Sequence, residues 1–370
     1  MVWSTSDVTF DGRCQSHLHR GKNTDGRTTG MPMQKSIEAV FYQCEHTGAF
    51  LKGPAAVVNI LKSHYGESCG AAPYTLSHFS SILGYRFIRE GVTCFIPQSK
   101  TPPSSDGPFP FAPLLASKDL IVPPLLMPRH MMLICDAIRA NERNPDGLTV
   151  DFCLAVIYTP SNMGRYFESL FSEIDSFRPY MQHIDECIRA YLFGYVSVAV
   201  SGLILASEGI LREIGAKIDS RFEGITSKDQ FINVLTKIED ILMAKAYPGV
   251  EVPGFMRLKE YMLGFDEQLC LVDNFREYFT TRLYQKTSEV EGAIDMNRHS
   301  VLHGLSMDFN KPINFYRLFI MLVFLAFVSV LLGHSRASSF VPETERSKLK
   351  SNCYDKLAAL GASMKVRFPI

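Results

Sequence analysis

One short segment of the chain concentrates side chains that bind anions and exchange protons. Within seven positions stand Asn297, Arg298, His299 and His303, and Gly304 follows them. A guanidinium binds phosphate oxygens through paired hydrogen bonds and keeps its charge, whereas a histidine gains or loses a proton near neutral pH. These residue types therefore suit acid–base chemistry on a phosphodiester.

The spacing of the two histidines indicates one face of a helix. His299 and His303 are four residues apart, so on a helix their imidazoles lie on the same side. Arg298 would project from an adjoining edge of that face. Gly304 is the residue type that most readily ends a helix just after its cap. We therefore expect a helix that ends here and presents both imidazoles together.

Two other interpretations of these residues stay open. Two imidazoles one turn apart can hold zinc, but the segment lacks the glutamate of the HExxH pattern and has no obvious third ligand nearby. We therefore predict no metal and no cofactor. Alternatively, the histidines are structural, hydrogen-bonded inside a helical bundle, with Arg298 paired to a carboxylate such as Glu208.

The elements that must position this segment are predicted to be mainly α-helical. Apolar residues recur at helical spacing over 178–217, which indicates one long helix or two helices joined near Gly194 or Gly202. A second amphipathic helix is predicted over 228–246, and a third near 254–284. The C-terminal half therefore reads as a helical bundle.

The N-terminal half gives a mixed pattern. A short helix is predicted within 49–64, beginning near Pro54, and the run 129–144 also has helical spacing. The apolar run 150–158 fits a buried strand or a buried helix equally well. Prolines between residues 96 and 129 exclude long regular structure there. We expect an N-terminal domain of uncertain, possibly mixed α/β structure.

These patterns divide the chain into four parts. Residues 1–35 show no period and predict a flexible leader. Residues 36–170 form an N-terminal domain of unknown role, and residues 171–340 form the helical domain. Residues 341–370 carry a slight basic excess and predict a solvated tail or a short helix.

The segment 318–333 is the one place where the sequence raises the question of a membrane. It is 16 residues long and contains no charge between Arg317 and His334. A membrane helix needs roughly 18 to 20 apolar residues, so the run is somewhat short. We expect a buried helix of the bundle, with a membrane helix as the alternative.

Composition limits the compartment and the partners. Lys plus Arg equals Asp plus Glu at 38 each, so a polybasic nucleic-acid binder is excluded. The nine cysteines are scattered and form no CxxC pair, which favours reduced thiols. The first residues lack the apolar core of a signal peptide. These features predict a cytoplasmic protein.

The string RHSVLHG at 298–304 resembles the R-polar-x3-H motif of the HEPN superfamily of helical ribonucleases. Upstream, residues 190–213 look like the long helix that precedes this motif in HEPN-like proteins of bacterial defence and abortive-infection systems. The apolar helix expected after Pro312 resembles the closing core helix of such a bundle. The resemblance covers residues 171–340, which is under half of the chain.

This resemblance implies a metal-independent endoribonuclease that acts as a homodimer on RNA, in a toxin-like or antiviral defence role. His303 matches the histidine of the family and would handle the proton of the ribose 2′-OH or of the leaving 5′-oxygen. Arg298 would hold the scissile phosphate, and His299 would orient Arg298 or contact phosphate. Three further residues are expected to support the site or bind substrate: Asn297, Glu208 and Arg212.

Two alternatives accompany that expectation. HEPN-like domains also act as non-catalytic RNA-binding or dimerisation modules, and the same motif would serve there. Such a module could be tethered to a membrane through residues 318–333. An antitoxin or another regulator is a possible further partner of either form.

Overall fold

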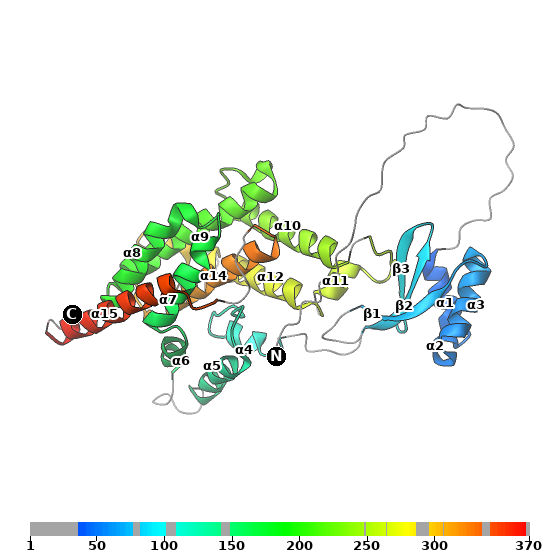
Figure 1. Ribbon diagram of the computed structural model, residues 1–370, viewed down its shortest axis with the longest axis horizontal. Coiled ribbons are helices and arrows are strands. Elements are labelled where there is room, and N and C mark those ends of the chain that lie inside the picture. The colour runs from blue at the N-terminus through cyan, green and yellow to red at the C-terminus, as the bar shows by residue number, and fades with distance from the viewer. Residues whose placement is uncertain are drawn as a thin grey trace. The chain divides into compact units, whose positions relative to one another are not determined.

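The computed structural model describes residues 36–76, 82–100, 109–141, 149–247, 249–263, 265–285, 296–305, 307–334 and 341–367. The protein is mainly helical, with 66% helix and 7% strand, and has a small three-stranded sheet near the N-terminus (Figure 1). The predicted mainly α class is therefore confirmed at this level. The leader expected over residues 1–35 lies outside the described residues.

Three helices and three strands form the first part of the described chain. Their bounds are α1 Ile37–His46, α2 Ala49–Lys52, α3 Pro54–Tyr65, β1 Ala71–Thr75, β2 Leu83–Arg89 and β3 Val92–Pro97. The sheet is antiparallel in the order β1-β2-β3. Glu90 and Gly91 join β2 to β3 with φ of 52° and 82°, the backbone of a tight two-residue hairpin turn. Buried residues of the strands, such as Tyr85 and Phe87, share one hydrophobic cluster with α1 and α3.

Four helices follow the sheet. They are α4 Ala112–Ala116, α5 Pro128–Asn141, α6 Val150–Ile157 and α7 Pro160–Ser169. The ambiguous apolar run near 150–158 is a helix, and the Thr149 hydroxyl caps it by accepting a hydrogen bond from the Phe152 N–H at 3.2 Å. Helix α3 begins at Pro54, as the sequence predicts.

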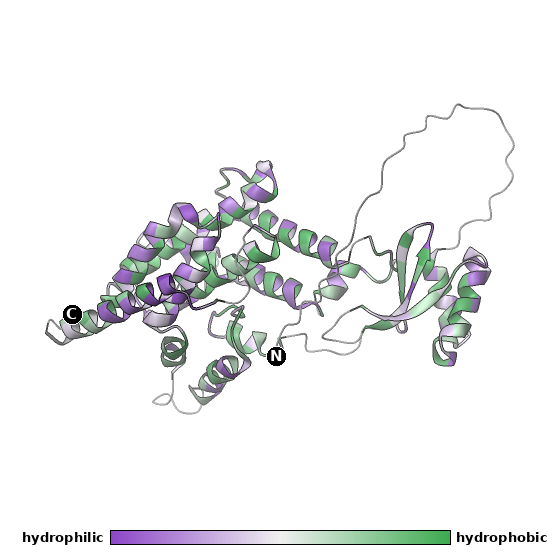
Figure 2. Cartoon of the chain, in the orientation of Figure 1, coloured by the Kyte–Doolittle hydropathy of each residue, from purple (hydrophilic) through white to green (hydrophobic). Residues whose placement is uncertain are grey.

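The remaining helices form the bundle that carries the motif. They are α8 Met181–Leu192, α9 Val196–Ile218, α10 Lys228–Ala246, α11 Leu258–Met262, α12 Glu267–Tyr278, α13 Arg298–Leu302, α14 Pro312–Leu331 and α15 Glu345–Arg367. Four short elements supplement them: the 3₁₀ turns η1 Phe171–Glu173, η2 Arg178–Tyr180 and η3 Ser220–Phe222, and the π-helix η4 Phe279–Leu283. Hydrophilic and hydrophobic residues alternate around α8, α9 and α10 (Figure 2), as their amphipathic patterns predict.

Two glycines decide how the predicted 178–217 helix is built. The chain breaks at Gly194, whose φ of 95° suits glycine, and α8 and α9 lie on either side of it. Gly202 instead stays inside α9, where a Cβ would lie 2.3 Å from the Cys187 Sγ of α8. The first glycine therefore turns the chain, and the second lets the two helices pack closely.

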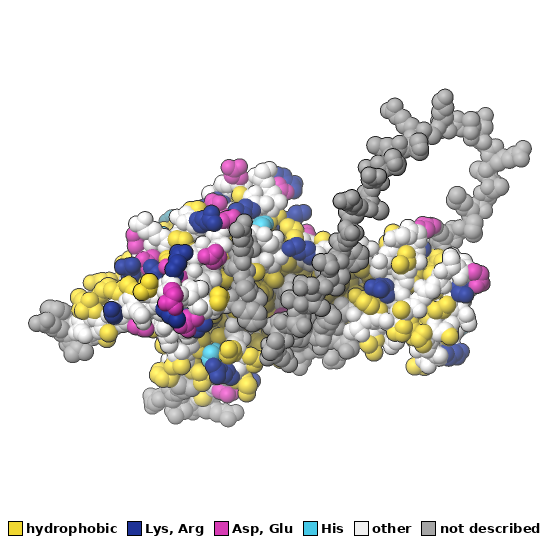
Figure 3. Space-filling view, in the orientation of Figure 1, with side chains coloured by type: hydrophobic (Ala, Val, Ile, Leu, Met, Phe, Trp, Pro, Cys, Tyr) yellow, Lys and Arg dark blue, Asp and Glu magenta, His cyan; other side chains and the backbone are white. Residues whose placement is uncertain are grey.

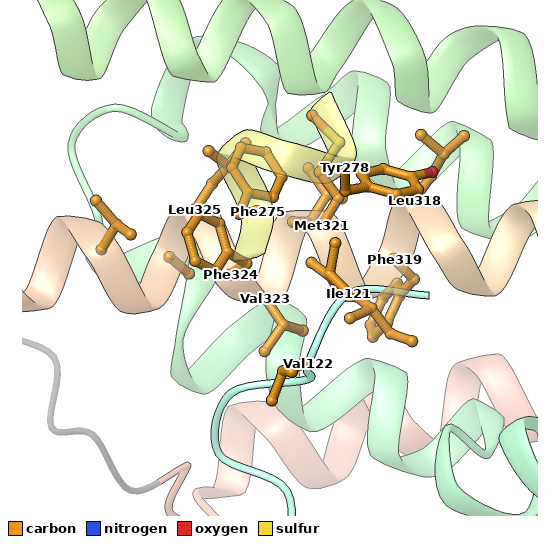
Figure 4. Close-up of a cluster of buried hydrophobic side chains, with 14 of the residues drawn as sticks. Ile121, Val122, Phe275, Tyr278, Leu318, Phe319, Met321, Val323, Phe324 and Leu325 are labelled. Atoms are coloured by element: carbon orange, nitrogen blue, oxygen red, sulfur yellow. The ribbon is translucent and has the colours of Figure 1, made fainter. Parts of the chain in front are cut away.

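Helix α14 lies inside the main hydrophobic cluster. Its Phe324 ring stacks on Phe275 of α12 with centroids 4.2 Å apart, and its Phe315 ring stacks on Tyr191 of α8 at 3.7 Å. Figure 4 shows side chains of α14 gathered with those of α12 and with Ile121 from the segment after α4. The apolar run near residues 318–333 thus forms part of the core of the bundle.

The same helix is the one described segment that could cross a membrane by its length and composition. It has 20 residues, and its most apolar 18-residue window has a mean hydropathy of 2.1 and is 83% buried inside the protein. Arg317 near its start is also buried, where it donates to the Asn314 side-chain oxygen and to the Lys118 carbonyl, each at 2.6 Å. A core helix of a soluble bundle meets the same length and composition criteria.

The C-terminal segment expected as a tail or short helix contains the 23-residue helix α15. It packs against α7 and α8. Lys and Arg side chains are interspersed with Asp and Glu over the region of α7, α9 and α15 in Figure 3. The main buried cluster runs from Leu76 to Tyr354, so α4–α7 and α15 share a core with the 171–340 region.

Candidate functional site

Asn297 fixes the start of the short helix α13. Its side-chain oxygen accepts hydrogen bonds from the backbone N–H groups of His299 at 3.0 Å and Ser300 at 3.1 Å, so it is the N-cap. Its amide group donates to the carbonyl of Gln285, just beyond η4, at 2.6 Å. Asn297 is only 1% exposed. Its contacts make it a residue that positions α13.

Arg298 extends from the first turn of α13 to the buried carboxylate of Glu208 on α9. The Arg298 Nε donates to Glu208 Oε1 at 2.7 Å, and Nη2 lies 3.5 Å from Oε2. The hydrogen bond to Glu208 raises the pKa of Arg298, which keeps the guanidinium charged. The Glu208 side chain is 8% exposed and that of Arg298 is 29% exposed. The Arg298 side chain is thus anchored by Glu208 and remains partly exposed to solvent.

Tyr284 completes this group, and the sequence did not predict it. Its hydroxyl donates a hydrogen bond to Glu208 Oε1, the same oxygen that accepts from Arg298. The Arg298 Cζ lies 5.6 Å from the centroid of the Tyr284 ring, a cation–π distance. Burial, together with the charge of Glu208, raises the pKa of the Tyr284 hydroxyl, so it stays protonated and remains a donor.

The two histidines lie together on the exposed side of α13. Their ring centroids are 4.3 Å apart, as four-residue spacing on a helix predicts. Both side chains are exposed. His303 stands at the C-cap with its N–H donating to the His299 carbonyl at 3.1 Å, and Gly304 follows with a φ of 64°. Both imidazoles are accessible to a ligand from solvent.

Arg212 makes its direct contacts with residues other than the predicted site residues. Its Nε donates to the Ile225 carbonyl at 2.7 Å, and its guanidinium lies 5.9 Å from the centroid of the Phe231 ring. These contacts fasten the connection between α9 and α10. The structure therefore brings Glu208 to Arg298 and gives Arg212 its hydrogen bond elsewhere.

Three segments that are far apart in the sequence thus build one site. Glu208 comes from α9, Tyr284 from the end of η4, and Arg298 with both histidines from α13. A guanidinium presents five N–H donors, and the Glu208 carboxylate occupies one edge of them. The other edge and the two imidazoles could bind an anion and exchange protons with it. Within the described ranges, no three His, Cys, Asp or Glu residues gather where they could hold a metal.

Nothing in the sequence order connects Tyr284 with the motif. It stands 76 residues after Glu208 and 14 residues before Arg298, outside the R-polar-x3-H pattern. The aromatic character of the 275–284 stretch was the one available signal, and it fits core packing equally well. Comparison with known proteins adds no further guide, because no family model, no curated protein and no solved structure matches the chain.

Proposed function

We propose that this protein is a metal-independent endoribonuclease of HEPN type with a toxin-like or antiviral defence role in the cytoplasm. One observation carries the proposal. A guanidinium anchored by a buried carboxylate lies on the same short helix as two exposed imidazoles, next to each other at 4.3 Å. This is the arrangement of groups that phosphodiester cleavage by proton transfer needs.

In the proposed reaction the substrate supplies its own nucleophile. The ribose 2′-oxygen attacks the adjacent phosphorus, and the bond from phosphorus to the 5′-oxygen breaks. The products are a 2′,3′-cyclic phosphate and a free 5′-hydroxyl, so only RNA can react. His303 accepts the 2′-OH proton or donates one to the leaving 5′-oxygen. Arg298 binds the phosphate oxygens as their charge develops, and His299 contacts phosphate beside it.

The proposal includes a homodimer that brings two copies of the motif together. Because His299 is assigned to the phosphate, His303 alone transfers protons in one copy of the motif, and one imidazole cannot remove one proton and donate another in the same step. A second exposed motif would provide the partner acid or base, and an antitoxin or another regulator could cover this face. Sedimentation or light scattering of the purified chain tests the dimer directly.

The deciding experiment compares the wild-type chain with His303→Ala. Each is incubated with labelled RNA in EDTA, and the product ends are analysed. We expect metal-independent cleavage that leaves 2′,3′-cyclic phosphate, and a loss of about a thousandfold or more in the variant, the upper range for losing a general acid or base. Replacing the exposed His46 of α1 by Ala is the matched control and leaves the rate unchanged.

Two results would contradict the proposal. Cleavage by His303→Ala at the wild-type rate would show that His303 takes no part in the reaction. Cleavage of strands with 2′-deoxyribose at the scissile positions would show that the reaction does not use the 2′-oxygen as its nucleophile. Growth of an expression host gives a parallel readout, because an active toxin-like nuclease slows growth and its His303→Ala variant does not.

A non-catalytic RNA-binding or dimerisation module is the second candidate. The ion pair favours it, because Arg298 already has a carboxylate partner in Glu208 without any substrate. In this case RNA binding, measured by fluorescence anisotropy, would persist in His303→Ala, and neither chain would cut RNA. Affinity would fall as salt rises, since Arg298 would contact phosphate.

A membrane-tethered form of this module would use α14, which has sufficient length and mean hydropathy. Cell fractionation tests it. Recovery of the expressed chain in the membrane fraction, with release only by detergent, supports the tether. Recovery without detergent in the soluble fraction opposes it and agrees with the burial of most of α14 inside the bundle.

A further inference from the structure

Tyr284 fills the position where α9, η4 and α13 meet. Its hydroxyl and the Arg298 Nε both donate to Glu208 Oε1, so two donors hold one carboxylate oxygen. The Tyr284 ring stacks on Phe279 with centroids 4.3 Å apart and interplanar angle 22°. It also lies 5.9 Å from Phe231 of α10. The ring is therefore fixed by the core, and its hydroxyl is aimed at the site.

A π-helix sets the direction of this tyrosine. The Tyr284 N–H donates to the carbonyl of Phe279, five residues earlier, at 2.9 Å. A hydrogen bond that spans five residues instead of four places one extra residue in the turn. One residue corresponds to a rotation of about 100° around an α-helix. Single π turns are frequent at functional sites. A continuous α-helix through this segment would therefore turn Tyr284 away from Glu208.

The local sequence explains why the helix widens here. The hydroxyl of Thr280 donates to the Arg276 carbonyl at 2.7 Å, and that of Thr281 donates to the Glu277 carbonyl at 2.8 Å. Threonine hydroxyls that bond four residues back compete with the helical hydrogen bonds and bend the helix. Lys228 of α10 also donates to the Thr280 carbonyl at 3.0 Å. These contacts satisfy carbonyls near the start of the π turn.

We propose that Tyr284 is a positioning residue for Arg298. Its hydroxyl holds the Glu208 carboxylate in one orientation, and its ring supports the guanidinium, so the remaining N–H donors of Arg298 face the substrate phosphate. The effect on catalysis rests on the proposed ribonuclease function. The positioning itself is a property of the free protein and can be measured without RNA.

Removal of the hydroxyl leaves a specific defect. In Tyr284→Phe the ring and its packing remain, but Glu208 Oε1 loses one of its two donors. A buried carboxylate that loses a donor seeks another, and Arg298 is the partner within reach. The guanidinium then turns further toward Glu208. The structure thus predicts a change in Arg298 geometry without a loss of the fold.

The test combines two readouts on Tyr284→Phe and a matched control. Tyr247→Phe is the control, because the Tyr247 hydroxyl also donates to a carboxylate oxygen, Asp266 Oδ2 at 3.0 Å, in the same bundle. The first readout is the ¹⁵N–¹H signal of the Arg298 Nε, identified by its loss in Arg298→Lys. The second is kcat and KM for RNA cleavage.

We expect the Arg298 signal to shift in Tyr284→Phe and to stay in place in Tyr247→Phe. We expect kcat to fall about tenfold with KM nearly unchanged, the size of effect for one hydrogen bond near a charged group. We expect the Tyr247→Phe control to keep the wild-type kcat and KM. A structural role for Tyr284 would lower the unfolding temperature and leave the Arg298 signal and kcat in place.

The outcomes separate this inference from the function on which it rests. An unmoved Arg298 signal in Tyr284→Phe overturns the positioning role, whether or not the wild-type chain cuts RNA. A shifted signal in a chain that cuts no RNA supports the positioning and overturns the ribonuclease. A shifted signal with unchanged kcat and KM in an active enzyme overturns the catalytic consequence.

Discussion

Two clusters in the bundle combine the same three kinds of side chain and differ in their access to solvent. Near the motif, the Glu208 carboxylate accepts from a tyrosine hydroxyl and from Arg298. Near the C-terminal helix, the Asp185 carboxylate accepts from the Tyr354 hydroxyl at 2.6 Å and from Lys350 Nζ at 2.9 Å. Each carboxylate thus joins a tyrosine and a cation from distant parts of the chain.

The cation distinguishes the two clusters. The Lys350 side chain is 15% exposed, and its ammonium lies 4.4 Å from the Phe167 ring centroid, so it is enclosed between α7, α8 and α15. The Arg298 side chain is 29% exposed and lies in the same short helix as the exposed His299 and His303. The same chemistry thus fastens a helix in one place and leaves donors available to a ligand in the other.

The sharpest test of this contrast removes each carboxylate charge in turn. Glu208→Gln weakens the anchor of Arg298, so we expect kcat for RNA cleavage to fall about a hundredfold. Asp185→Asn weakens the attachment of α15 and leaves the rate per folded molecule unchanged. Steady-state kinetics, with the folded fraction determined by circular dichroism, measures both. Equal losses of kcat in the two variants would show that the two clusters do not differ in their effect on catalysis.

The second test concerns the close contact that α15 makes in the structural cluster. Gly164 of α7 lies where an added Cβ would come within 2.7 Å of the backbone nitrogen of Ser351 in α15. Gly164→Ala improves helix propensity but overpacks this contact, so we expect a net loss of about 2 kcal/mol in unfolding free energy. Urea denaturation measures it.

Gly70 provides the control, because nothing lies within 4 Å of its added Cβ and its backbone does not require glycine. Gly70→Ala should change the unfolding free energy little. A Gly164→Ala protein as stable as the wild type would mean that α15 can shift outward at no cost. The cleavage rate per folded molecule should be the same in both variants.

The smallest expected effect is the pH dependence of the structural cluster. Burial alone would raise the pKa of Asp185, but hydrogen bonds from Tyr354, Lys350 and Arg189 outweigh it and lower the pKa. A carboxyl group with a lowered folded pKa stabilises the fold above its unfolded pKa, about 3.9. That contribution disappears as the pH falls through the folded value.

The measurement is urea denaturation between pH 7 and pH 3 for wild type and Asp185→Asn. We expect the wild type to be the more stable at pH 7 and the two unfolding free energies to converge toward the acid end. A constant difference over the whole range would show that Asp185 does not stabilise the fold through its charge. We expect the Tyr247→Phe substitution to leave the convergence of these two unfolding free energies unchanged.

Much of the helical pattern could be predicted because it depends on local signals. Helix α10 has the predicted bounds, 228–246, since Ser227 and Gln230 form a capping box at its start and an apolar face runs along it. The sequence pattern limits the break between α8 and α9 to one of two positions, Gly194 or Gly202. Sequence alone could not choose Gly194, because the close approach of Cys187 to Gly202 is a tertiary contact.

The site was predicted in part for the same reason. The neighbouring imidazoles follow from four-residue spacing on one helix, and the Arg298–Glu208 pair agrees with the structural interpretation of the motif. Tyr284 was not predicted, because its role depends on a π turn and on a partner 76 residues away. The length of α15 was also missed, since it packs through contacts with α7 and α8 rather than through a strong pattern of its own.

By itself, the sequence determined the mainly helical class, the grouping of two histidines on one helical face and the candidate chemistry of Arg298. Periodicity, caps and residue type act over a few positions, so they can be read along the chain. Only the tertiary structure decided that Glu208 and Tyr284 hold Arg298. A buried carboxylate takes its hydrogen-bond donors from whichever segments pack around it, and that packing depends on the whole bundle.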